Sequence, residues 1–93
     1  MNIPALAFGS VDIFKSLFGK DYVVHIVSTS DKFINVKLDV QHISDKELAQ
    51  YNTLLADKFG NQFISVKNGL SQPKGGRYYP KITVRFSKQE YQV

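Results

Sequence analysis

The stretch that decides the fold runs from Ser44 to Gly60 and reads SDKELAQYNTLLADKFG. It opens with Ser44 and Glu47, the S-x-x-E capping box that marks many helix starts. Ile43 and Leu48 occupy the two positions of a hydrophobic staple around the same start. We therefore predict that a helix begins at this point.

The remaining residues of this stretch support the same helix. Gly60 stands where a glycine commonly ends a helix. An earlier and shorter helix is predicted from Ser10 as its cap to Phe18, with Gly19 as its stop. The apolar stripe of the later helix recurs every three to four positions, at Leu48, Tyr51, Leu55 and Phe59.

Each predicted helix is followed by two predicted strands. Residues 22–28 are β-branched and almost continuously apolar, which predicts a strand covered on much of both faces. Residues 34–40 and 81–87 alternate apolar with polar, and 63–67 form a short strand between them. Pro80 lacks an N–H, which places the last strand at a sheet edge or starts it after the proline. The order α-β-β-α-β-β predicts one α+β domain over residues 1–93, an antiparallel sheet with both helices on one face.

That order suggests a duplicated αββ unit, with copies at residues 10–40 and 44–88. LFGKDYVVH from Leu17 aligns with KFGNQFISV from Lys58, and INVKLDV from Ile34 aligns with ITVRFSK from Ile82. In this alignment the loop at 68–78 is an enlarged version of the polar turn at 28–32. Enlarged loops are where function is often added to a scaffold.

Composition limits the function classes. The chain has 93 residues, 43% of them hydrophobic, which is enough for one core without a metal or disulfide. It has no cysteine, which excludes zinc-thiolate and thiol chemistry and fits a cytoplasmic location. We expect no signal peptide and no membrane partner, because the start lacks a cationic region followed by an apolar one and no long apolar run exists.

Positive charge is segregated along the chain. Residues 1–66 carry six Lys against seven Asp and Glu, whereas 67–93 carry six Lys and Arg against Glu90 alone. A local excess of this kind attracts polyanions or acidic protein surfaces.

The same segment contains the predicted contact site, in the hairpin loop 68–81 and the last strand. Glycines let backbone N–H groups approach a phosphate, cations attract it, and tyrosine rings can stack on bases. The predicted contact residues, for nucleic acid or another partner, are Lys67, Lys74, Gly75, Gly76, Arg77, Tyr78, Tyr79, Lys81 and Arg85. A solvated hairpin tip, with a tyrosine that only shields an apolar rim, is the competing interpretation.

Residues 69–79, GLSQPKGGRYY, resemble the DNA-binding loop of filamentous-phage single-stranded-DNA-binding proteins, where Ser, basic residues and Gly precede a Tyr. The likeness implies contact with single-stranded DNA. Those proteins are all-β barrels with this loop near their start, so the likeness assigns no family to this chain.

Strand parity predicts a wider surface opposite the helices. Phe33, Asn35, Lys37 and Asp39 share one side with Lys81, Thr83 and Arg85, and Phe63, Ser65 and Lys67 share one side of the third strand. Such a face serves equally as a basic sheet with aromatic platforms or as half of a homodimer interface.

Catalytic chemistry has little support. His25 lies in an apolar strand, and Asp39 and His42 straddle a strand end, so no converging set of ligands or nucleophile and base is visible. We predict no catalytic residue, no metal, no cofactor and no enzyme activity.

The sequence therefore predicts a small basic nucleic-acid-binding module, for single-stranded DNA or RNA rather than duplex. The alternative is a protein-binding inhibitor or adaptor, of the kind phages and other mobile elements encode, that docks the same basic surface on an acidic groove. A structural homodimer is the third alternative.

Overall fold

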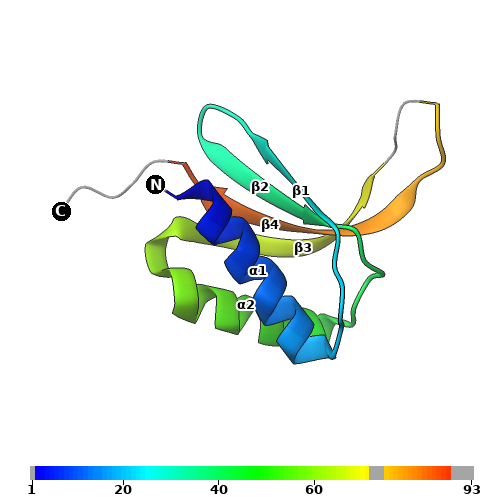
Figure 1. Ribbon diagram of the computed structural model, residues 1–93, viewed down its shortest axis with the longest axis horizontal. Coiled ribbons are helices and arrows are strands. Elements are labelled where there is room, and N and C mark those ends of the chain that lie inside the picture. Colours follow the sequence, from blue (N-terminus) through cyan, green and yellow to red (C-terminus); the bar gives the residue numbers. More distant parts are fainter. Residues whose placement is uncertain (1, 72–74, 89–93) are drawn as a thin grey trace.

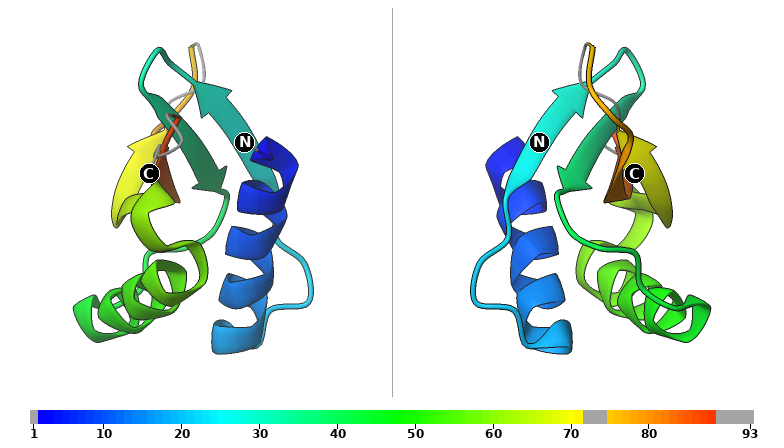
Figure 2. Two further views of the ribbon diagram at one scale, coloured as in Figure 1. Left: turned by 90° about the vertical axis from the view of Figure 1, so that its left-hand side faces the viewer. Right: turned by 90° about the vertical axis from the view of Figure 1, so that its right-hand side faces the viewer.

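The computed structural model describes residues 2–71 and 75–88. In chain order these residues form α1 (Ile3–Phe18), β1 (His25–Thr29), β2 (Phe33–Leu38), α2 (Asp45–Phe59), the 3-10 turn η1 (Gly60–Gln62), β3 (Phe63–Ser71) and β4 (Tyr79–Ser87). The strands make one antiparallel sheet in the order β1-β2-β4-β3. Both helices lie on one side of it (Figure 1) and run beside each other beneath it (Figure 2). The predicted α+β domain is confirmed.

Helix α2 begins as its sequence predicts. The Ser44 hydroxyl accepts a 3.1 Å hydrogen bond from the Glu47 N–H, and the Glu47 carboxylate accepts one of 3.0 Å from the Ser44 N–H. Both N–H groups belong to the first turn, which has no intrahelical partner for them. The helix ends at Gly60, whose φ is 58°.

Helix α1 begins well before the predicted start at Ser10. Asn2 is the cap, because its side-chain oxygen accepts a hydrogen bond from the Ala5 N–H, and Pro4 sits in the first turn where no N–H partner is lost. Ser10 is fully buried inside the helix and donates its hydroxyl to the Leu6 carbonyl at 2.7 Å. The prediction that Ser10 caps this helix was therefore wrong. The sequence alone does not distinguish a serine that caps a helix from one that bonds to the preceding turn.

The strands also differ from their predicted bounds. Strand β1 starts at His25 rather than Tyr22 and is an edge strand with one covered face, since Ile26 is 54% exposed. Strands β3 and β4 continue into the predicted loop as far as the pair Ser71 and Tyr79. The hairpin therefore has a longer ordered arm and a shorter tip than the sequence indicates.

The prediction for Pro80 was wrong, because β4 is a central strand that includes it. The last pair between β2 and β4 joins Leu38 to Ile82, so Pro80 lies past the end of β2 and its missing N–H removes no bond to that strand.

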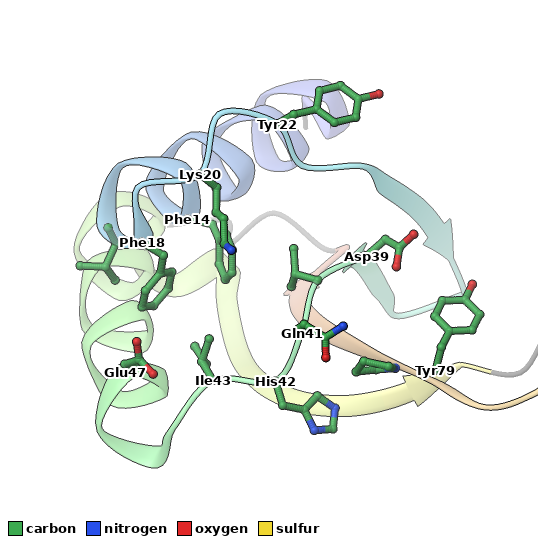
Figure 3. A pocket seen from close by; sticks show the side chains of 13 residues that line it. Phe14, Phe18, Lys20, Tyr22, Asp39, Gln41, His42, Ile43, Glu47 and Tyr79 are labelled. Carbon is green, nitrogen blue, oxygen red and sulfur yellow. The ribbon is translucent and has the colours of Figure 1, made fainter.

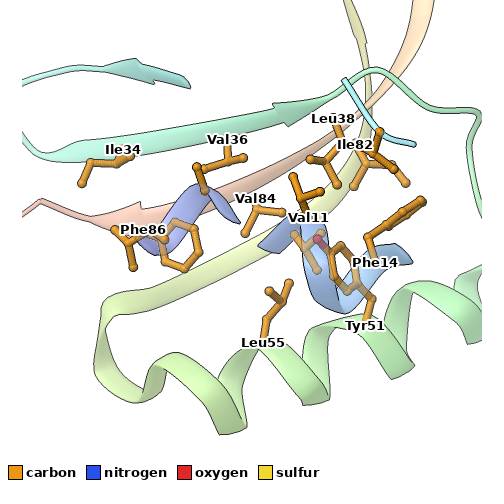
Figure 4. Packing of buried hydrophobic residues seen from close by; sticks show 14 residues of the cluster. Val11, Phe14, Ile34, Val36, Leu38, Tyr51, Leu55, Ile82, Val84 and Phe86 are labelled. Carbon is orange, nitrogen blue, oxygen red and sulfur yellow. The ribbon is translucent and has the colours of Figure 1, made fainter. Parts of the chain in front are cut away.

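The core lies between the sheet and the two helices (Figure 4). Alternate residues of β2 and β4 point into it, and the apolar stripes of both helices close it from below. Burying each such side chain stabilises the fold by roughly 1.5–3 kcal/mol relative to exposure. The residues with no exposed surface include Ile34, Val36, Leu38, Tyr51, Leu55, Ile82, Val84 and Phe86.

The central pair of strands has a symmetric register. Val36 pairs with Val84, and on either side of them Ile34 pairs with Phe86 and Leu38 with Ile82. The aligned motifs equate Ile34 with Ile82 and Leu38 with Phe86. If each residue is replaced by its equivalent, the pair of Ile34 with Phe86 becomes the pair of Ile82 with Leu38, which is also present. This is the register that a two-fold relation between αββ units requires; the duplication itself stays a prediction.

The outer strands do not follow the predicted alignment. Val27 pairs with Val36 and Val66 pairs with Val84, so Val27 corresponds to Val66, whereas the alignment equates it with Asn68. The link from the end of α1 to β1 is longer than the link from α2 to β3, and this difference shifts the strands.

Candidate functional site

The sheet has one face that no helix covers. The four strands contain no Asp or Glu, and their only charged residues are cations. The pairing places all of these cations on the uncovered face, opposite the side of Val36 and Val84. They are Lys37, Lys67, Lys81 and Arg85.

Two of the lysines lie in one transverse row. Lys37 of β2 and Lys67 of β3 both pair with Thr83 of β4, which stands between them. Because neighbouring strands are ~4.8 Å apart, the two lysine backbones are about 10 Å apart across the sheet. Ile26 of β1 pairs with Lys37 and extends the row to the sheet edge.

The next row contains Arg85, whose side chain contacts both Phe33 and Asn35. The guanidinium of Arg85 lies 4.6 Å from the ring centroid of Phe33, and its Nε donates a 3.0 Å hydrogen bond to the side-chain oxygen of Asn35. Among the described residues, no hydrogen-bond acceptor is found for its two terminal nitrogens. A planar guanidinium held in this way can offer both terminal nitrogens to a phosphate or carboxylate.

Lys81 is buried, although it belongs to this face. Its residue is 4% exposed, and its Nζ lies 5.2 Å from the ring centroid of Tyr79, two positions earlier in β4. The tyrosine ring attracts the ammonium charge, and almost none of the lysine side chain reaches solvent. Lys81 therefore adds positive charge from beneath the face rather than a mobile ammonium at its surface.

The bulge in β3 corrects one predicted set. Phe63 pairs with Phe86 and their ring centroids are 6.1 Å apart, so Phe63 faces the helices. The register shifts between Phe63 and Ser65, which places Ser65 and Lys67 on the uncovered face. The prediction that these three residues share a side was wrong, because a bulge breaks the alternation.

The predicted contact residues therefore form two groups. Lys67, Tyr79, Lys81 and Arg85 share the uncovered face, whereas Gly75, Gly76, Arg77 and Tyr78 are exposed at the end of the β3–β4 hairpin. Lys74 lies outside the described residues. Tyr78 is 66% exposed and precedes β4, so it joins neither the core nor the sheet face.

Lys37, Asn35 and Phe33 belong to the same face, as strand parity predicted, although the predicted contact residues did not include them.

A cavity of about 760 Å³ lies at the end of the sheet, next to this face (Figure 3). Its walls come from the end of α1 and the turn after it, from the connector between β2 and α2, and from the start of β4. Tyr79 belongs to both the cavity and the sheet face. The exposed polar side chains around it include Lys20, Asp39, Gln41 and His42.

The histidines have structural contacts. The ring of His25 packs edge-on against Phe8 at 5.7 Å, and Nε2 of His42 is 2.7 Å from the Gly69 carbonyl oxygen. Within residues 2–71 and 75–88, no group of three or more His, Asp or Glu is placed to hold a metal ion. None of the helices in this part of the chain has the length and hydropathy of a membrane-spanning segment.

No protein-family model matches this chain, and comparison with curated proteins and with solved structures gives no significant match.

Proposed function

We propose that this chain is a nucleic-acid-binding module that holds a single strand against the uncovered face of its sheet. The observation that carries the proposal is the charge of that face, where each charged residue of the four strands is a cation. Cations along a surface neutralise backbone phosphates, and this term supplies most of the affinity in binding that does not depend on sequence.

The side chains of the face suggest a division of roles. Lys37 and Lys67 contact phosphates as point charges, and Arg85 contacts one through its two terminal nitrogens. The buried Lys81 adds positive charge to the face from beneath it. The Arg85 side chain gives up little conformational freedom on binding, because Phe33 and Asn35 already hold it.

Aromatic rings favour a single strand over a duplex. Bases in a duplex are stacked on one another, whereas a single strand presents base faces that can stack on aromatic side chains. Tyr78 is the exposed ring at the hairpin end, and Tyr79 has one face toward Lys81. We therefore assign base stacking first to Tyr78, at the hairpin end next to this face, and then to Tyr79 on the face itself.

The test is a titration of a fluorescein-labelled single-stranded oligonucleotide with the whole chain, followed by anisotropy at several salt concentrations. We expect binding at micromolar protein and low salt, with log Kobs falling against log salt by about 0.7 for each phosphate neutralised. A duplex of the same length should bind more weakly. No anisotropy change at about 50 mM salt would refute the proposal, because electrostatic binding is strongest there.

The same face could instead meet an acidic protein surface, and a second measurement separates the two. Immobilised protein is incubated with lysate with and without nuclease. A partner that is lost after nuclease treatment supports the proposal; a partner that persists, from a chain that does not bind the oligonucleotide, indicates the inhibitor or adaptor instead.

A further inference from the structure

Strand β1 presents an unpaired edge. The bonds from the Ser30 N–H to the Phe33 carbonyl and from the Asp39 N–H to the Val24 carbonyl, both 2.9 Å, fix the hydrogen-bonding phase of the β1–β2 ladder. Residues of an antiparallel strand bond alternately to either side, so Ile26 and Ser28 bond to β2. The N–H and C=O groups of His25, Val27 and Thr29 therefore point away from it. In the described part of the chain, no strand lies on that side.

The other edge of the sheet, strand β3, is protected, unlike β1. Strand β3 has a bulge and the charged Lys67, and its far end is covered by the connector before α2. There the side chain of Asn68 bonds to both the N–H and the carbonyl of Ile43. Residues 22–30, YVVHIVSTS, contain no Lys, Arg, Asp, Glu or Pro. Natural sheets usually guard a free edge with such residues, so β1 has the character of an edge meant to be paired.

Exposed apolar side chains gather at the same edge. Phe8 of α1, which packs on His25, is 58% exposed, and Tyr22 just before the strand is 80% exposed. Val24 and Ile26 are 43% and 54% exposed. Exposed apolar side chains on both faces of a strand, beside unpaired backbone groups, are typical of an interaction site.

We propose that a second copy of this chain pairs its own β1 with this edge, antiparallel, around a two-fold axis at Val27. The three outward residues are spaced symmetrically about Val27, so that Val27 faces Val27 and His25 faces Thr29 of the second copy. In this register every outward N–H and C=O of both strands has a partner, and a shift in either direction leaves some unpaired. The uncharged strand meets no like charge when it pairs with itself. The two sheets become one continuous sheet.

This proposal is independent of nucleic-acid binding, and light scattering after size exclusion tests it first. We expect a mass near twice the 10.5 kDa of one chain, with a fall toward the single mass on dilution. A single-chain mass at every concentration from low to high micromolar would overturn the proposal.

The variant Thr29→Pro tests the edge itself. Thr29 is exposed and its N–H points outward, so proline removes no bond to β2 but removes a donor at each end of the paired strands. We expect the single-chain mass with an unchanged circular dichroism spectrum. The matched control Thr29→Ala keeps the N–H and should keep the doubled mass.

A second variant, Ile26→Glu, works without a backbone change. Within one copy the new carboxylate stands opposite Lys37, which favours the fold, whereas across the axis the two new carboxylates are diagonal neighbours on one face, about 7–8 Å apart, and repel each other. We expect dissociation here and none in Leu54→Glu, an exposed apolar position on α2. A doubled mass that persists in both Thr29→Pro and Ile26→Glu would overturn the proposal and place the contact elsewhere.

The register has its own test. In a sample of mixed labelled and unlabelled chains, an isotope-filtered NOE should join the Hα of Ile26 to the Hα of Ser28 of the second copy, since these residues face each other in a pair without direct hydrogen bonds. A dimer that lacks this NOE would refute the pairing at Val27.

Discussion

The phenol of Tyr51, on α2, donates a 2.7 Å hydrogen bond to the backbone carbonyl of Ser10, on α1. Both residues have no exposed surface, and the Tyr51 ring also lies edge-on to Phe14 at 5.4 Å. This bond joins the two helices at a buried point, in addition to the apolar packing around it. It fixes how the helices lie against each other beneath the sheet.

The Tyr51→Phe variant should be less stable by about 1 kcal/mol, because it removes one neutral buried hydrogen bond and keeps the ring. Urea unfolding followed by circular dichroism measures this difference. Tyr22→Phe is the matched control, since Tyr22 is 80% exposed and should give no change. Equal stability of Tyr51→Phe and the parent chain would mean that the bond contributes nothing.

Alkaline pH should weaken the fold through the same residue. Burial raises the pKa of Tyr51 above its ordinary value of 10.0. The folded chain then keeps a proton that the unfolded chain loses above pH 10, so stability is complete below that pH and falls by up to ~1.4 kcal/mol per pH unit above it. The stability advantage of the parent over Tyr51→Phe should shrink as pH rises past 10. An advantage that stays constant to pH 11 would contradict this.

Gly9 marks the close approach of the helices. A Cβ at this position would lie 2.6 Å from Cζ of Phe59 and 2.9 Å from Cε of Lys58. The Phe59 ring packs on Phe86 at 5.0 Å and cannot move freely. Overpacking of this kind costs roughly 1–3 kcal/mol, and the gain in helix propensity offsets ~1 kcal/mol of it. With two contacts below 3.0 Å we expect the upper part of that range, so Gly9→Ala should be destabilising.

A double-mutant cycle assigns that cost to the contact. Phe59→Leu removes the ring atoms that the new Cβ would meet. Gly9→Ala should therefore lower the free energy of unfolding less in the Phe59→Leu chain than in the parent chain, as measured by urea unfolding. Ser16→Ala, an exposed position on α1, is the control and should change stability by less than ~0.5 kcal/mol. A cost of Gly9→Ala that is the same in both backgrounds would exclude Phe59 as its cause.

Local signals explain which parts of the fold can be predicted from sequence. The start of α2 depends on Ser44 and Glu47, which act within one turn, and Gly60 ends it by its own backbone freedom. The faces of β2 follow from simple alternation. The start of α1 depends on whether Ser10 bonds forward or to Leu6, and its sequence does not distinguish the two.

The candidate site was predictable to the same extent. Parity places Lys81 and Arg85 on one face, and the structure agrees. The bulge that turns Phe63 to the core is set by pairing with β4, and the burial of Lys81 comes from the strands around it. Both are properties of the assembled sheet, so a local pattern cannot contain them.

The capping box of α2 should make stability depend on acid. Hydrogen bonds from the Ser44 backbone and then its side chain lower the pKa of Glu47 below 4.5. A lowered pKa means that this contribution is complete above the unfolded value and is lost as pH falls through the folded one. Ser44→Ala should cost about 1 kcal/mol at neutral pH. Glu47→Ala removes the carboxylate that the Ser44 N–H bonds, so thermal melts should show that Glu47→Ala destabilises the chain less near pH 3 than at neutral pH; Lys46→Gln serves as the neighbouring control.

Salt dependence should locate the contact on the uncovered face. Lys37→Gln and Lys67→Gln each remove one cation from the row through Thr83, so each should lower the slope of log Kobs against log salt by about 0.7 for a single strand. Lys46→Gln, an exposed position on α2, should leave the slope unchanged.

Arg85→Lys keeps the charge but loses the planar group that Phe33 and Asn35 hold, so we expect weaker binding with nearly the same slope. Arg77→Ala tests the hairpin end in the same assay, since Arg77 is exposed there and away from the row. The contrary result is that Arg77→Ala abolishes binding, with affinity and slope unchanged in Lys37→Gln and Lys67→Gln. That outcome would mean that the hairpin end holds the nucleic acid and that the sheet face has another use. If the row variants lower the slope as expected, the phosphates lie across the strands, because only neutralised phosphates contribute to it.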